Sequence, residues 1–123
     1  MGKPAEAIKA LVELLELIPT DAESWAELSD LYFSQNAYGQ AIYSLEEVLL
    51  ITPNAWNIHA RLGELLYISS ESNQAEGTQL KQLTESVRRF SRSIELCDNY
   101  LRGFYGLKLV GYNQPPYYGT TSH

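Results

Sequence analysis

A sequence pattern that repeats after 34 residues constrains the fold of this chain more than any other feature. Shifted by 34, the first segment aligns its small, large and proline positions with a later one, pairing Ala7 with Ala41, Ile8 with Ile42, Leu11 with Leu45 and Pro19 with Pro53. The next segment obeys the same shift, pairing Leu28 with Leu62, Ser29 with Gly63 and Leu31 with Leu65. A period of this length predicts a solenoid of stacked helix pairs.

Apolar residues at spacings of three and four predict amphipathic helices at about 4–17, 22–35, 38–51 and 55–69. Pro19 and Pro53 are expected to stop two of them, because proline cannot continue a helix interior. Asn36 is expected to adopt the left-handed conformation that reverses the chain between two helices. Thr20 and Glu23 have the spacing of a capping box at the start of the second helix.

The period then breaks, because eleven extra residues precede the next match. The polar stretch 69–78 predicts a mobile loop. With an offset of 45 the pattern resumes, and a long helix is expected to bury a seam made of Leu80, Leu83, Val87, Phe90, Ile94 and Cys97. Asp98 stands where the earlier units have proline, and a last helix is expected from about Asn99 to Val110.

The large, small, aromatic and proline positions resemble the tetratricopeptide signature, which implies an all-α superhelix of antiparallel helix pairs in a right-handed solenoid. The expected organisation is one domain, 1–111, followed by an irregular tail, 112–123. The domain divides into a half repeat 4–19, a full repeat 22–53, an expanded repeat 55–98 with the loop 69–78, and a half repeat 99–111. Uncovered end helices predict a fragment of a longer solenoid, coverage by another chain, or self-association.

Charge is distributed unevenly along the 123 residues, whose net charge is −6. Residues 1–55 carry two lysines and nine acids, whereas residues 56–123 carry seven basic residues and six acids. This balance argues against nucleic acid as a ligand, since the phosphate backbone requires a basic footprint. No apolar run approaches the ~18 residues that cross a bilayer, so a membrane association is expected to be peripheral at most.

Residue types suited to catalysis or metal binding do not form recognisable patterns in this sequence. Cys97 is the single cysteine, which excludes an internal disulfide and fits a reducing compartment. His59, Cys97 and His123 lack metal-ligand spacing, and no acid–base pair or phosphate loop is present, so neither a cofactor nor an enzymatic activity is predicted. His59 is expected to be a packed residue, since it takes the place of Trp25 in the preceding unit.

A partner-binding groove is predicted where the first helix of each pair would line the concave face. The exposed positions by spacing are Asp30, Phe33, Asn57, Arg61, Glu64, Tyr67, Arg102 and Tyr105. Aromatic residues and arginine dominate interface hot spots, so these side chains suit a peptide or helix ligand; the alternative is that they only pack neighbouring repeats. The acidic residues in this set argue against a clamp for a C-terminal carboxylate, which requires positive charge.

A basic group lies late in the chain and comprises Lys81, Arg88, Arg89, Arg92, Arg102 and Lys108. It could contact acidic partner segments or anionic lipid headgroups. The interleaved Glu85 and Glu95 favour the other interpretation, in which these residues form the solvated side of a helix.

Several stretches resemble the family of subunit two of the endoplasmic reticulum membrane protein complex: 2–9, 21–32, 45–54 and 101–107. The resemblance covers roughly residues 2–110 and is best before the 69–78 insertion. It implies a non-enzymatic scaffold on the cytosolic face of a complex that inserts transmembrane proteins, with the other subunits as partners and no catalytic residues. The alternative is a generic tetratricopeptide adaptor that binds peptide or helix segments in another assembly.

Overall fold

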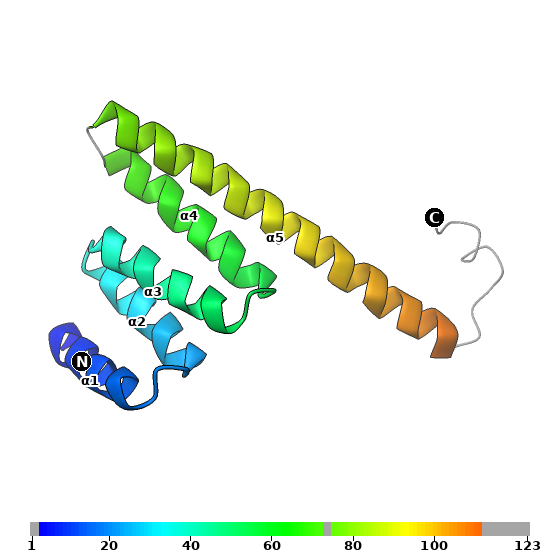
Figure 1. The fold of residues 1–123 in the computed structure, drawn as a ribbon, viewed down its shortest axis with the longest axis horizontal. Helices are drawn as coiled ribbons and strands as arrows, with labels where there is room; N and C mark the ends of the chain where they lie inside the picture. The colour runs from blue at the N-terminus through cyan, green and yellow to red at the C-terminus, as the bar shows by residue number, and fades with distance from the viewer. Residues whose placement is uncertain (1–2, 73–74, 112–123) are drawn as a thin grey trace.

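The computed structural model describes residues 3–72 and 75–111, with side chains described up to Arg102. These residues form five helices: α1 (Pro4–Leu17), α2 (Ala22–Ser34), α3 (Tyr38–Ile51), α4 (Trp56–Ser72) and α5 (Glu76–Gly111). Successive helices reverse direction and stack side by side, and α5 lies along α4 and extends well beyond it (Figure 1). The predicted all-α helical-repeat class is confirmed for the described part of the chain.

Proline and asparagine end the first three helices as expected. α1 ends at Leu17 and α3 at Ile51, each two residues before a proline. Asn36, between α2 and α3, has a φ of 61°, in the left-handed region. The predicted cap of α2 was wrong by one residue, because Asp21 rather than Thr20 occupies the N-cap and its carboxylate accepts a hydrogen bond from the Ser24 hydroxyl at 2.8 Å.

The first helix of each pair is tied to the preceding turn by a ring nitrogen. The Trp25 indole N–H donates to the Pro19 carbonyl at 2.8 Å. The His59 Nε2 lies 2.9 Å from the Pro53 carbonyl, which can only accept, so Nε2 carries the proton. His59 is buried and therefore performs the role of Trp25 in the next unit, as the sequence predicted.

In each helix pair, a serine hydroxyl bonds a carbonyl of the other helix where the two helices approach closely. Ser29 on α2 donates to Ala41 on α3 at 2.8 Å. In the next pair the serine lies on the second helix instead of the first, and the Ser86 hydroxyl on α5 donates to the Gly63 carbonyl on α4 at 2.8 Å. A small residue on both helices lets the backbones approach, and the hydroxyl satisfies a buried acceptor.

The hydrophobic core lies mainly between α3 and α4. Its buried members are Ala41, Ile42, Leu45, Val48, Leu49, Leu62, Leu65 and Leu66. Partly buried residues of α2, including Trp25, Tyr32 and Phe33, pack against this cluster. α3 therefore supplies five of the eight buried core residues, and α4 supplies the other three.

The C-terminal part departs from the predicted helix bounds. α5 is one helix of 36 residues, so the expected break at Asp98 and the separate helix at 99–110 are absent. Asp98 and Asn99 replace the proline that stops α1 and α3, and Asp98 instead supports the helix through a 3.4 Å ion pair with Arg102 one turn later. The division into repeat units itself stays a prediction, and the predicted tail 112–123 lies outside the described residues.

The expected loop 69–78 is also shorter than predicted. α4 continues through Ser69 and Ser70, both buried, to Ser72, and α5 begins at Glu76. The Gln82 side-chain amide donates to the Ser69 hydroxyl at 3.0 Å, which gives these serines a packing role. Polar composition suggested a loop here, but the Ser69 hydroxyl accepts a hydrogen bond from α5, and the Ser70 hydroxyl donates to the Tyr67 carbonyl of its own helix.

The apolar seam of α5 does not form the buried face that was expected. Leu80, Val87 and Ile94 are 66%, 64% and 69% exposed, and Phe90 is 39% exposed. The positions buried against α4 are instead Ser86 and Ser93, whose hydroxyls bond the Gly63 and Trp56 carbonyls. α5 is therefore rotated so that its small residues approach α4 closely. Among its large residues, Phe90 still lies against Gly63 with part of its ring exposed, whereas Leu80, Val87 and Ile94 are mostly exposed.

Candidate partner-binding surface

Arg61 lies at the centre of the predicted groove residues. Its guanidinium bonds Glu64 at 2.9 Å, reaches Asp30 at 3.9 Å, and stacks over the Phe33 ring with 4.8 Å between Cζ and the ring centroid. α2 supplies Asp30 and Phe33, and α4 supplies the other two residues. The fold thus brings four of the eight predicted positions into one cluster, which we call the Arg61 surface.

The Arg61 surface is pre-arranged but still reachable from solvent. The side chains of Asp30 and Glu64 are 72% and 57% exposed, and that of Arg61 is 34% exposed. Two carboxylates share one guanidinium, so the cluster keeps a negative balance. An arginine held flat over an aromatic ring presents a fixed platform with polar edges, which suits recognition of another protein segment.

Tyr38 enlarges the aromatic part of this surface, although the sequence prediction omitted it. Its ring lies 5.6 Å from the Phe33 ring, centroid to centroid, and its hydroxyl donates to Asn36 at 3.2 Å. The left-handed Asn36 turns the chain sharply, and this turn places the first residue of α3 beside the last turn of α2. An aromatic residue at the start of a helix, after a connection of only three residues, was the available signal.

Asn57 and Tyr67 flank the Arg61 surface along α4. Both are exposed, and their spacing from Arg61 and Glu64 places them along one side of the helix. A hydrogen bond with Glu71, together with the negative charge of that carboxylate, raises the pKa of the Tyr67 hydroxyl. Tyr67 therefore stays neutral and keeps a polar tip at physiological pH.

Arg102 lies apart from this surface. It belongs to the part of α5 that extends past α4, nine residues beyond Ser93, whose hydroxyl bonds the first residue of α4. Its guanidinium pairs with Asp98 on its own helix. The side chain of Tyr105 lies outside the described residues, so the structure assigns it no place.

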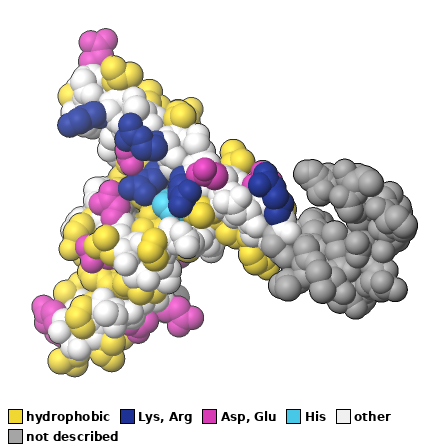
Figure 2. All heavy atoms as spheres, turned by 45° about the vertical axis from the view of Figure 1, so that its right-hand side comes forward, with side chains coloured by type: hydrophobic (Ala, Val, Ile, Leu, Met, Phe, Trp, Pro, Cys, Tyr) yellow, Lys and Arg dark blue, Asp and Glu magenta, His cyan; other side chains and the backbone are white. Residues whose placement is uncertain are grey.

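The balance of charge differs between the two ends of the molecule. In Figure 2, Lys and Arg lie over α4 and α5 together with Asp and Glu, whereas the charged side chains of the part formed by α1 to α3 are mainly Asp and Glu. This difference follows the uneven charge of the sequence. Partners of opposite charge would therefore favour different ends.

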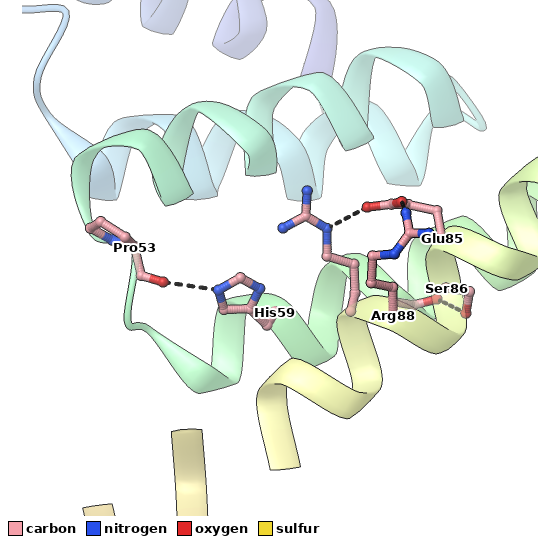
Figure 3. A network of polar contacts seen from close by, with 7 residues as sticks. Pro53, His59, Glu85, Ser86 and Arg88 are labelled. Atoms are coloured by element: carbon pink, nitrogen blue, oxygen red, sulfur yellow. Dashed lines mark hydrogen bonds and ion pairs between the residues drawn. The ribbon is translucent and has the colours of Figure 1, made fainter. Parts of the chain in front are cut away.

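An ionic cluster on α5 is centred on Glu85 (Figure 3). Glu85 bonds Arg88 at 2.6 Å and Arg89 at 2.9 Å. Burial raises the pKa of Glu46 on α3, while the charge of Arg89 lowers it in part and the charges of Glu85 and Glu47 raise it further. Two members of the predicted basic group are thus engaged within the fold rather than free for a ligand.

No group of three or more His, Cys, Asp or Glu residues that could hold a metal ion occurs in residues 3–72 and 75–111. Cys97, expected in the core, is only partly buried. Among the described helices, none is long and apolar enough to cross a membrane.

Comparison with known proteins connects this fold to named relatives. The chain is 35% identical over 107 residues to the TPR repeat protein oca3 of Schizosaccharomyces pombe, covering 87% of this chain and 36% of that protein. It is 35% identical over 97 residues to ER membrane protein complex subunit 2 of Saccharomyces cerevisiae, covering 79% and 33%. The corresponding subunit of Xenopus tropicalis is 32% identical over 106 residues, covering 86% and 33%.

The chain therefore spans about a third of the length of these relatives. The model of the tetratricopeptide repeat family matches residues 1–62, about half of the chain. Together with the helix pairs, their close small-residue contacts and the 34-residue period, this match shows that the chain belongs to the tetratricopeptide repeat family.

Proposed function

We propose that this chain is a non-enzymatic scaffold that holds other subunits of an endoplasmic reticulum membrane protein complex together. The observation that carries the proposal is the similarity, over most of the chain, to proteins named as subunit 2 of that complex. A repeat fold with an exposed, pre-arranged Arg61 surface supports a role in protein contacts. The resemblance further implies that such a complex inserts transmembrane proteins.

The proposed location is the cytosolic face of the endoplasmic reticulum membrane, with attachment through other subunits. The Arg61 surface would bind one of them. Because Asp30 and Glu64 leave it with a negative balance, it favours a segment that carries basic and apolar side chains.

Affinity purification of the tagged chain from detergent-solubilised membranes tests this proposal. Integral endoplasmic reticulum membrane proteins should co-purify in fixed ratio, and Arg61→Glu should reduce their recovery while the helical content measured by circular dichroism stays unchanged. Arg92→Glu is the matched control, since Arg92 also forms an exposed pair with a glutamate three residues away.

Recovery of soluble proteins alone would contradict the membrane-complex role and favour the adaptor alternative. Equal losses for both variants would show that overall charge, rather than the Arg61 surface, governs assembly.

A further inference from the structure

A second concave site lies on the opposite side of α2 from the Arg61 surface. It is an open groove of about 360 Å³ between α1, α2 and α3. The α2 side chains that line it are Trp25, Leu28 and Tyr32, spaced along one helix face, whereas Asp30 and Phe33 point to the other. The two sites are therefore structurally separate.

Aromatic rings form two fixed walls of this groove. The Trp25 ring is held by its hydrogen bond to the Pro19 carbonyl. The Tyr43 ring on α3 lies 6.0 Å from it, with 78° between the ring planes. Both rings line the groove, so its aromatic faces are oriented before any ligand arrives.

The charged side chain that lines the groove beside these rings is acidic. Glu16 lines the groove from α1, and none of the lining residues is Lys or Arg. The negative charge of Glu47, with burial and a hydrogen bond to the same carboxylate, raises the pKa of the Tyr43 hydroxyl, so a second carboxylate stands at the rim. An apolar floor with an acidic rim is complementary to an aliphatic segment carrying a positive charge.

The repeat supplies an internal counterpart of the groove between α3, α4 and α5. The offset of 45 maps Gln40, Tyr43 and Ser44 onto Glu85, Arg88 and Arg89. The offset of 34 maps Val12 onto Glu46 and Trp25 onto His59. Of these counterparts, Glu85, Arg88 and Arg89 form the ionic cluster of Figure 3, and the charges of Glu85 and Arg89 act on Glu46.

At that counterpart the chain provides its own cations. Arg89 bonds Glu85 at 2.9 Å, its side chain is only 28% exposed, and its charge acts on Glu46. The groove between α1, α2 and α3 has a serine where Arg89 would stand, and Gln40 and Val12 where Glu85 and Glu46 would stand. Its carboxylates, Glu16 and Glu47, stand at other positions and have no arginine from the groove lining beside them.

We propose that the groove between α1, α2 and α3 binds an aliphatic segment of a partner protein through a lysine or arginine side chain. The partner's cation supplies the positive charge that the groove lining lacks. It lies against the Trp25 and Tyr43 rings near Glu16, while the aliphatic side chains contact Leu28. This site does not depend on the proposed membrane complex, since it uses none of the Arg61 surface.

Fluorescence of Trp25 provides the test, in a Trp56→Phe background so that one indole reports. The probe is acetyl-Gly-Leu-Leu-Arg-Leu-Leu-Gly-amide, compared with the same peptide carrying Gln in place of Arg. The Arg peptide should bind, and the Gln peptide about fivefold or more weakly, because it loses the cation–aromatic and ionic contacts. Glu16→Gln should weaken the Arg peptide selectively and leave the Gln peptide unchanged.

A double variant, Gln40→Glu with Tyr43→Arg, transfers the Glu85–Arg88 pair of the counterpart into the groove. It should abolish Arg-peptide binding while the thermal midpoint stays close to that of the parent, since both positions are exposed. Arg61→Ala should leave peptide binding unchanged.

Equal affinity for both peptides, no binding of the Arg peptide at its solubility limit, or loss of binding in Arg61→Ala would each overturn the proposal. None of these outcomes bears on whether the chain co-purifies with membrane proteins, so the two proposals fail independently.

Discussion

The two helices α3 and α5 occupy equivalent places in successive helix pairs, yet their surroundings differ on both sides. On one side, α3 presents Tyr43 to an open groove, where α5 presents Arg88 to an ionic cluster. On the other side, Leu45 is 2% exposed in a core cluster with leucines of α4, whereas its counterpart Phe90 lies against Gly63 of α4 and remains 39% exposed. The repeat thus fixes the contact within each pair, and neighbouring helices decide what each outer face becomes.

Replacing the equivalent large residues of α3 and α5 by alanine should give the largest difference in the free energy of unfolding. Leu45→Ala is expected to lower the free energy of unfolding by about 2–5 kcal/mol, as for other fully buried leucines. Phe90→Ala should cost less although the side chain is larger, because part of the ring already faces solvent. Urea denaturation of both variants measures the difference. An equal or larger loss for Phe90→Ala would mean that the outer face of α5 is covered in solution.

The α2–α3 and α4–α5 pairs share a close contact between small residues, and placing a large side chain there tests that contact. Ala41 is fully buried against α2, so Ala41→Leu should cost about 1–3 kcal/mol. Ser86→Leu should cost a similar amount, since Ser86 takes the same place against Gly63. Thermal unfolding followed by circular dichroism compares both with Ser91→Leu, an exposed position on α5. Unchanged midpoints for Ala41→Leu and Ser86→Leu would show that these helices do not approach closely.

The smallest expected effect concerns Glu46, which faces the ionic cluster from α3. Its folded-state pKa is raised, chiefly by burial, above the ordinary value of 4.5. The folded state therefore holds this proton more tightly, and the contribution of Glu46 to stability falls as pH rises from about 4.5 through the raised pKa. Glu46→Gln should raise the thermal midpoint slightly at neutral pH, and this gain should vanish below the ordinary value.

Glu27→Gln, at an exposed position on α2, is the control for this titration. A lower midpoint for Glu46→Gln at neutral pH would show that the attraction to Arg89 outweighs the cost of burying the carboxylate.

The sequence predicted the regular part of the fold because its stop signals are local. Pro19, Pro53 and Asn36 each act on their own backbone, so the first three helices end where expected. The continuity of α5 was missed because Asp98 permits a helix without requiring its end. The rotation of α5 was missed because apolar spacing identifies a stripe without saying whether a neighbour covers it.

The sequence likewise predicted only part of the candidate surface. Asp30, Phe33, Arg61 and Glu64 share a face because the 34-residue period places α2 and α4 in equivalent positions. Arg102 was misplaced together with the helix to which it was assigned. The groove beside α1 could not be read from spacing, since its existence depends on how the aromatic side chains of three helices fill the space.

The ring-to-proline hydrogen bond described for Trp25 and His59 has a consequence for which residues this repeat accepts. The two residues share a ring that carries an N–H, although an indole and an imidazole differ in size and hydrophobicity. Phenylalanine has no donor, and the tyrosine hydroxyl lies at the far tip of its ring, so neither reproduces this geometry. A histidine at a tryptophan position is therefore a chemically conservative exchange in this repeat, although most residue classifications would place the two far apart.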